Sequence, residues 1–461
     1  MRRTTHFGLI LSCFAAIAIA APGAPKAADQ GAVKAVASGS WHVYRGGPNM
    51  HGIAQGKLTD KPVLLWKYKT DRAIKSSPIV DKGVVFIGSN DGFVHAVKLK
   101  TGKPVWKFRV EAPKVSNEKN VVRDGDGKDA GGGNDGKGPN SKDAKKRDVS
   151  KPNSKGDGAK PKSDPEKKKP APKEEDEPPA HFVPEAIEAP PLYLDGHVIF
   201  GASNGFLYSV DAKTGKEVWK YETEAEILGS ANWVLGPDKK SKRILIGSYD
   251  NFLHCVDAKT GKMIWKYETD NYINGAPAID RGGVVFGGCD GFVHVVSVDK
   301  GEKVASIEVE GYIAGTVALD EGRAYTGNMG NTFVCVDLTA KEMVWDYKDR
   351  NFPFFSAAAL TDKHAIFGGR DRRLHCVNRD TGASIWQFKT RGQVDSSPVV
   401  CDDKVVVGSE DGRVYMVSLE KGEKIWDYEI GKPVMSSPAI VDGIIVIASE
   451  DGFVYAFGEK K

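Results

Sequence analysis

Short segments in which apolar and polar residues alternate follow one another along most of the chain, in an order that recurs. One unit starts with an inner segment around Ser76 and continues with a Val-Val-Phe-Ile-Gly segment. An Asp-Gly turn leads into a Phe-Val-His-Ala-Val segment, and a Thr-Gly turn leads into a last segment around Trp106. Alternation with period two, bounded by Gly and Asp, predicts four short β-strands per unit.

The unit repeats in register through the chain. Its turn is clearest in Gly88-Ser-Asn-Asp-Gly92, Gly247-Ser-Tyr-Asp-Asn251 and Gly408-Ser-Glu-Asp-Gly412. The position of the last-strand tryptophan recurs at Trp66, Trp106, Trp219, Trp265, Ala305, Trp345, Trp386 and Trp426. Apart from two intervals the step is 40 or 41 residues, and four-stranded units of this length are typical of β-propeller blades. Eight positions predict eight blades.

The two ends of the repeat region complete each other. Leu64–Tyr68 reads as an outer strand without three strands before it, whereas Ser436–Phe457 supplies three strands without an outer one. Joining them leaves no open sheet edge across the ring. The sequence therefore predicts an all-β, eight-bladed propeller of four-stranded blades, closed by the N-terminal outer strand.

The N-terminus has the pattern of an export signal. Arg2 and Arg3 precede an apolar run from Phe7 to Ala20, which is shorter than the ~20 residues that span a bilayer. The run continues past Cys13, which disfavours lipoprotein anchoring at that residue. The export signal therefore favours a periplasmic or secreted protein. The predicted organisation is a signal peptide (1–28), a leader (29–60), the closing strand with blade 1 (61–110), a disordered low-complexity insertion (111–189) and blades 2–8 (190–461).

Composition narrows the choice of partners and redox chemistry. The formal net charge is only +4, and no basic stripe stands out, so nucleic acid is not an expected partner. Cys255, Cys335 and Cys376 occupy one repeated strand position, which is typical of small core residues and not of ligands. The chain has no adjacent pair of cysteines.

The repeat resembles the pyrroloquinoline-quinone-like propeller repeat, which quinoprotein dehydrogenases share with the propeller lipoprotein of the outer-membrane assembly machinery. Trp41 to Gly52 resembles a leader of secreted members. In the dehydrogenases the resemblance implies a quinone, a disulfide of adjacent cysteines, calcium and an aspartate base. This chain lacks the cysteine pair and the long pocket loops. We therefore expect no catalytic residue, no metal and no cofactor, with a quinone–calcium oxidoreductase as the alternative.

Residues that depart from the repeat are the candidates for function. The Asp-Gly turns and the loops between blades should share one face of the ring. Loops of this face on blades 4–6 carry Tyr272, Tyr312, Phe352, Phe354, Arg370, Arg372 and Arg373. Aromatic residues beside arginines suit a protein or peptide partner, so we expect a monomeric interaction scaffold associated with the cell envelope. The alternative, that the aromatics plug the channel and the arginines form local ion pairs, stays open.

Overall fold

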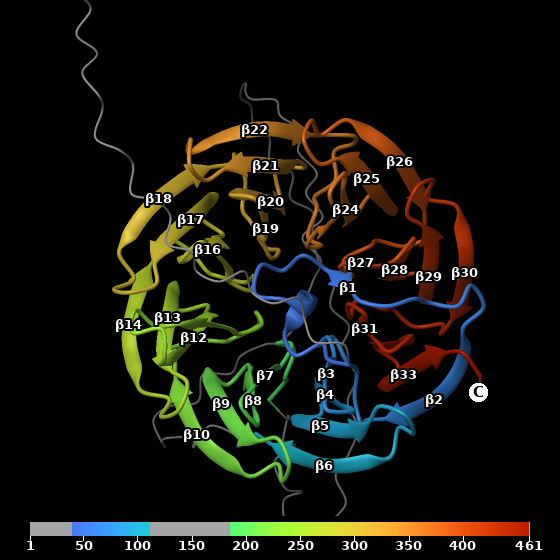
Figure 1. The fold of residues 1–461 in the computed structure, drawn as a ribbon, viewed down its shortest axis with the longest axis horizontal. Helices are drawn as coiled ribbons and strands as arrows, with labels where there is room; N and C mark the ends of the chain where they lie inside the picture. Colours follow the sequence, from blue (N-terminus) through green and yellow to red (C-terminus); the bar gives the residue numbers. More distant parts are fainter. Residues whose placement is uncertain (1–38, 111–184, 461) are drawn as a thin grey trace, which may run out of the picture. The chain divides into compact units, whose positions relative to one another are not determined.

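The computed structural model describes residues 39–110 and 185–460, whose strands form eight sheets arranged as a ring (Figure 1). The predicted signal peptide, and residues 111–184 of the predicted insertion, lie outside the described residues. Within the two described ranges, no helix has the length and apolar character that crossing a membrane requires. The prediction of an eight-bladed propeller with four-stranded blades is confirmed.

Each blade is an antiparallel sheet that runs from an inner strand at the channel to an outer strand at the circumference. Blades 1 and 2 contain β3 (Ile79–Asp81), β4 (Val84–Gly88), β5 (Phe93–Lys98), β6 (Pro104–Arg109), β7 (Leu192–Leu194), β8 (His197–Gly201), β9 (Phe206–Asp211) and β10 (Glu217–Glu222). Blades 3 and 4 contain β11 (Asn232–Leu235), β12 (Lys242–Gly247), β13 (Phe252–Asp257), β14 (Met263–Glu268), β15 (Ala278–Asp280), β16 (Gly283–Gly287), β17 (Phe292–Ser297) and β18 (Lys303–Glu308).

The second half of the ring continues the pattern and closes it. Blades 5 and 6 contain β19 (Ala318–Asp320), β20 (Arg323–Gly327), β21 (Phe333–Asp337), β22 (Glu342–Tyr347), β23 (Ala359–Leu360), β24 (His364–Gly369), β25 (Arg373–Asn378) and β26 (Ser384–Lys389). Blades 7 and 8 contain β27 (Val399–Cys401), β28 (Lys404–Ser409), β29 (Arg413–Ser418), β30 (Lys424–Glu429), β31 (Ala439–Val441), β32 (Ile444–Ala448), β33 (Phe453–Gly458) and β2 (Val63–Lys69). Because β2 pairs with β33, the N-terminal strand closes the ring, as predicted.

Burial along the strands follows from the stacking of the blades. The third strand of each blade lies between two neighbouring blades, and β5 is buried at four consecutive positions. The outer strand β6 instead alternates between exposed and partly buried residues, since only one of its faces meets a neighbour. The third strands also hold Cys255, Cys335 and Cys376, which are fully buried, and burial raises the pKa of each thiol to about 12. Their predicted role as core residues is confirmed.

The repeated tryptophan contacts a turn of the next blade at six blade boundaries. The indole of Trp219 donates a hydrogen bond to the carbonyl of Ala258 in blade 3 at 3.2 Å and lies against Gly261. That glycine has a φ of +69°, and a Cβ on it would come within 2.6 Å of the indole. Five further Trp–Gly pairs repeat this contact: Trp66–Gly102, Trp106–Gly215, Trp265–Gly301, Trp345–Gly382 and Trp386–Gly422. The glycine is therefore required both by the turn and by the indole.

The boundary between blades 4 and 5 departs from this rule at both positions. Blade 4 has Ala305 in the tryptophan slot, and blade 5 has Lys341 in the glycine slot, with a φ of +59°. The Lys341 ammonium donates to the carbonyl of Val304 at 3.3 Å. Without an indole to contact, the turn tolerates a side chain.

We expect these two departures to be energetically coupled. Ala305→Trp alone should lower the free energy of unfolding by about 2 kcal/mol, because the indole would meet the Lys341 side chain. Adding Lys341→Gly should restore most of that loss, which gives a coupling energy of about 2 kcal/mol. Urea unfolding of wild type, both single variants and the double variant measures this coupling. Additive effects would show that the indole and the turn do not touch.

Candidate functional site

The two faces of the ring differ in the loops that form them. The Asp-Gly face carries the turns between the second and third strands and the loops from each outer strand to the next inner strand. Backbone hydrogen bonds join these two kinds of loop in every blade, as from Asn90 N–H to the carbonyl of Ala73 in blade 1 and from Met329 N–H to that of Tyr312 in blade 5. The predicted sharing of one face is therefore confirmed. The opposite Thr-Gly face carries the remaining turns.

The described part of the leader begins at residue 39, contacts the inner strands at the centre of the ring as far as residue 54, and then runs outward to β2 (Figure 1). It begins with an isolated bridge between Trp41 and Val80, continues through η1 (Tyr44–Gly46) and ends in β1 (Ile53–Ala54), which pairs with β27. Its carbonyls accept N–H groups of five blades: His42 from Tyr193, Pro48 from Ile279, Asn49 from Leu319, His51 from Leu360 and Gly52 from Val400. The leader therefore links blades around the ring before the chain enters β2.

A buried arginine holds the centre of the leader. Arg45 is 1% exposed; its guanidinium donates to the carbonyls of Pro398 at 2.6 Å and Ala358 at 2.7 Å. Burial lowers the pKa of Arg45 to about 10, so the group keeps its charge at neutral pH. Gly52 is needed beside it, because a Cβ at that position would lie 2.0 Å from the guanidinium. Arg45 thus ties the leader to blades 6 and 7.

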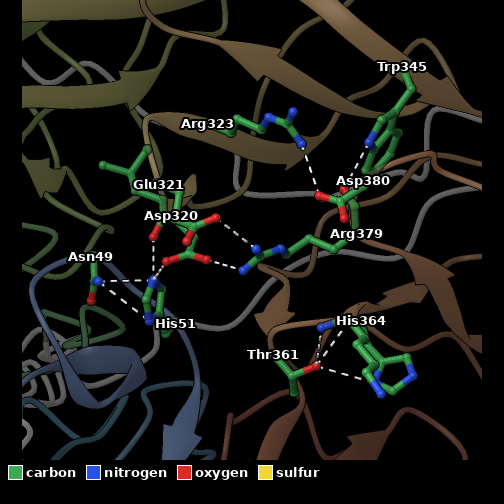
Figure 2. Close-up of polar contacts among 12 residues, drawn as sticks. Asn49, His51, Asp320, Glu321, Arg323, Trp345, Thr361, His364, Arg379 and Asp380 are labelled. Atoms are coloured by element: carbon green, nitrogen blue, oxygen red, sulfur yellow. Dashed lines mark hydrogen bonds and ion pairs between the residues drawn. The ribbon is translucent and has the colours of Figure 1, made fainter.

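A second set of polar contacts anchors the leader on the Thr-Gly face (Figure 2). His51 lies 3.3 Å from the carboxylate of Asp320 in blade 5, and that carboxylate also pairs with Arg379 of blade 6. The hydrogen bond from His51 is the largest cause of the lowered pKa of Asp320, and Arg379 adds to it. Since the groups satisfy one another across three parts of the chain, we interpret this cluster as an anchor of the leader.

A cavity of about 180 Å³ opens on the Asp-Gly face, and Tyr44 of the leader lies in its lining. Each blade contributes the residue just after the buried Ile, Phe or Val that precedes its inner strand. These residues are Lys75, Glu188, Leu228, Asn274, Ala314, Phe355, Asp395 and Met435. Beneath them lie hydroxyl groups that join neighbouring blades; the Ser77 hydroxyl, for example, accepts the Ser437 N–H at 2.9 Å. The Tyr44 hydroxyl lies 3.1 Å from that of Ser397.

The charged groups of this cavity are paired. Lys75 lies 3.1 Å from the carboxylate of Glu188, and Arg370 lies 2.8 Å from that of Asp395. The Arg370 guanidinium also covers the ring of Phe355, 3.9 Å from its centre. Because these groups pair with one another, they leave no excess of either charge in the cavity. The cavity is also smaller than the ~300–1,000 Å³ of most ligand pockets.

The rim outside the cavity carries the exposed aromatic residues. On the Asp-Gly face, the large apolar side chains that the structure shows as exposed are Tyr272, Tyr312, Met329 and Phe352, with exposures of 47%, 55%, 49% and 47%. All four belong to loops and turns from the end of blade 3 to the start of blade 6. Tyr272 also stacks on Tyr249 at 4.8 Å. Sequence reasoning missed Met329, although five of the seven equivalent turn positions hold Asn, Ser, Arg or Glu.

The other predicted site residues have different surroundings. Phe354 is 2% exposed and packs on Gly327 in the core; it fills the slot held by Ile273 and Ile313 in the preceding blades, so it does not belong to a surface. Arg370 is paired with Asp395, and Arg373 lies near Asp349 and Asp371 at 3.5 Å and 3.6 Å. Arg372 is exposed and forms no ion pair with any described residue.

Four Asp–His–Tyr clusters between blades were also missed. In blade 4 the His294 Nε2 group donates to Asp290 at 2.9 Å, and the Tyr267 hydroxyl of blade 3 lies 3.3 Å from His294 Nδ1. The other clusters are Asp91–His95–Tyr68, Asp250–His254–Tyr221 and Asp371–His375–Tyr347. The recurring Asp-x-x-x-His spacing in the turn was the available sequence signal. Because the clusters recur between blades, we interpret them as structural clamps.

One clamp lies beside a set of groups with metal-ligand chemistry. Asp349, Asp371 and His375 bring ligand atoms within 4.8 Å of one another. However, the Arg373 guanidinium lies between the two carboxylates, and His375 is engaged by Asp371 and Tyr347 as in the other clamps. An arginine already supplies the positive charge, so this cluster does not define a metal site.

The strand pairing defines a closed-ring propeller, and part of the leader lies in its channel. A family model described as the β-propeller of the β-alanine-activating enzyme matches residues 230–461, half of the chain, and one described as outer membrane protein assembly factor BamB matches residues 58–133. The chain belongs to the pyrroloquinoline-quinone-like β-propeller family. A comparison with curated proteins found no match.

Solved structures share the fold at low sequence identity. BamB from Moraxella catarrhalis is 17% identical over 87% of this chain and 98% of its own, with a TM-score of 0.60. The quinohemoprotein alcohol dehydrogenase of Comamonas testosteroni is 12% identical over 93% of this chain and 82% of its own, with a TM-score of 0.67. A computationally designed protein, Ika8, is 15% identical over 85% and 98%, with a TM-score of 0.61. At these identities the likeness concerns the fold alone.

Proposed function

We propose that this chain is an exported, non-catalytic propeller that binds another protein at the cell envelope through its Asp-Gly face. The observation that carries the proposal is the row of exposed Tyr272, Tyr312, Met329 and Phe352 on neighbouring blades. Exposed aromatic and methionine side chains gathered on one face are typical of protein interfaces. The N-terminal export pattern and the resemblance to BamB support a place at the envelope.

The charges of the cavity also favour this function over a quinone-dependent oxidoreductase. Pyrroloquinoline quinone carries three carboxylates, yet Lys75 and Arg370 are each already paired with a carboxylate. Calcium prefers several free oxygen ligands, and the same pairing engages Glu188 and Asp395. The residues of the cavity therefore fit neither the quinone nor its calcium, and we propose that the protein works without them.

Site-specific photocrosslinking in intact cells tests the proposed function. A photoreactive phenylalanine analogue at Tyr312 or Phe352 should give an adduct with one defined protein, because both side chains lie on the exposed row. Leu235 is the matched control, since it is 42% exposed at the end of β11 on the Thr-Gly face. No adduct at either rim position, or an equal adduct at Leu235, would contradict a binding role of this face.

A further inference from the structure

Departures from the repeat gather on one part of the Asp-Gly face, where blades 5 and 6 meet. We call Tyr312, Met329, Phe352, Arg372 and Arg391 the blade 5–6 strip. Backbone hydrogen bonds run from Met329 to Tyr312, from Phe354 to Asn328, from Arg370 to Pro353 and from Thr390 to Arg372. These bonds join the segments that carry the five residues. The strip is therefore one continuous surface, apolar toward blade 5 and basic toward blade 7.

Arg372 has a backbone conformation that, at the equivalent positions of the other blades, is adopted by glycine or asparagine. It occupies the left-handed position of the Asp-Gly turn with a φ of 66°. The equivalent residues are Gly92, Gly205, Asn251, Gly291, Asn331, Gly412 and Gly452. Arginine is strained there, whereas glycine is not. Its side chain is exposed and unpaired among the described residues, so no ion pair of the side chain with these residues offsets the backbone strain. Strain of this kind tends to mark functional positions.

The sign of the surface charge changes at the strip. The loop residue five positions after the tryptophan slot is Glu224, Asp270 and Glu310 after blades 2, 3 and 4, but Arg350 and Arg391 after blades 5 and 6. Arg391 is exposed, and its side chain forms no ion pair with the described residues. Arg372 and Arg391 lie on segments joined by the hydrogen bond from Thr390 N–H to the Arg372 carbonyl at 3.0 Å. Two guanidinium groups that form no ion pair with a described residue thus lie beside the apolar row.

We propose that the blade 5–6 strip binds a short acidic segment of the partner protein, with apolar side chains against Phe352 and Met329 and carboxylates against Arg372 and Arg391. The inference rests on the proposed function and names the chemistry of its partner. Guanidinium groups form bidentate, charge-assisted hydrogen bonds with carboxylates. Apolar residues next to the guanidinium groups exclude water, which increases the contribution of such pairs to the free energy of binding.

A short peptide segment fits the surroundings better than a broad anionic surface does. Glu310 and Asp270 are exposed on the neighbouring loops, so an anionic membrane or a nucleic acid lying across the face would meet two like charges. Such ligands also need an extended basic surface. A segment a few residues long can contact the two arginines and the apolar row without crossing those acids.

Fluorescence anisotropy with a defined probe tests the inference on the full chain. A fluorescein-labelled peptide built from Asp-Leu-Glu-Phe repeats should bind the wild type, and its affinity should fall as salt rises. Arg372→Gly should weaken binding about tenfold while leaving the melting temperature unchanged or higher, since glycine suits the turn. Arg391→Ala should also weaken binding. A peptide of Lys-Leu-Arg-Phe repeats should bind poorly.

Arg281→Gly is the matched control. Arg281 is also exposed and left-handed, with a φ of 47°, but it lies on the Thr-Gly face, so its loss should not change peptide binding. Equal binding of the acidic peptide by Arg372→Gly, or equal binding of the basic peptide, would overturn the inference. Binding of phosphatidylglycerol vesicles that requires Arg372, without peptide binding, would overturn it in favour of a membrane surface. A crosslinked partner at Tyr312 without acidic-peptide binding rejects this inference alone; the absence of both rejects the proposed function too.

Discussion

Arg45→Ala is expected to lower the free energy of unfolding by about 4 kcal/mol. The substitution leaves the carbonyls of Pro398 and Ala358 without their donor and opens a cavity where the side chain was. A buried acceptor without a partner costs about 1–3 kcal/mol, and the cavity adds to this loss. Release of the desolvated charge offsets only part of it. The leader should detach from blades 6 and 7.

Urea unfolding followed by tryptophan fluorescence measures the loss, and limited proteolysis shows whether the leader becomes accessible. Arg323→Ala is the control, because Arg323 pairs with Asp380 at the surface, at 3.1 Å and with 32% of its side chain exposed. Such pairs contribute about 0–1 kcal/mol. If Arg45→Ala were no more destabilising than Arg323→Ala, the leader would be held by its backbone contacts and not by the arginine.

The architecture could be predicted from the sequence because the repeat records it many times. Trp66 lies in an outer strand that precedes blade 1, and β2 does pair with β33 at the other end of the chain. Most blades use the same turn and the same interblade contact, so the same residue types recur at the same spacing. Even the exceptions agree, since Ala305 and Lys341 change together where the indole is missing.

The path of the leader could not be predicted in the same way. Trp41 to Gly52 has no period, because the residues of this segment contact different blades at irregular intervals. The burial of Arg45 depends on two carbonyls more than three hundred residues away. A charged residue in a polar segment carries no sign of such a place. Information held in single long-range contacts does not appear as a pattern along the chain.

Phe354 shows a different kind of miss, which the repeat could have prevented. The sequence placed it with Phe352 on the interaction face, but it occupies the slot of Ile273 and Ile313. The loop before it is one residue longer than its equivalents, so counting from Trp345 shifts the register. Counting back from Ser356 and Ala357, which precede β23, restores it. The site therefore consists of the residues that remain exposed after this correction.

Acid should weaken the ring through its Asp–His–Tyr clamps. In blade 4, burial raises the pKa of Asp290, but the hydrogen bond and charge of His294 and two backbone N–H groups outweigh burial, so the pKa is lower than usual. A carboxyl with a depressed pKa in the folded state contributes stability that is complete above its unfolded pKa of about 3.9 and is lost as the pH falls through the folded value. The same direction holds for Asp91, Asp250 and Asp371.

Asp290→Asn isolates one clamp. At pH 6 we expect it to lower the free energy of unfolding by about 2 kcal/mol, because a charge-assisted, buried hydrogen bond to His294 is lost. The gap between wild type and variant should stay constant down to about pH 5 and shrink below about pH 4, as the wild-type carboxyl protonates. Urea unfolding between pH 6 and pH 2.5 measures the gap. Asp195→Asn is the control, since Asp195 pairs with Lys242 while 61% exposed, and its effect should stay below about 0.5 kcal/mol. A gap at Asp290 that did not change with pH would mean that shape, and not the ionised carboxylate, joins these blades.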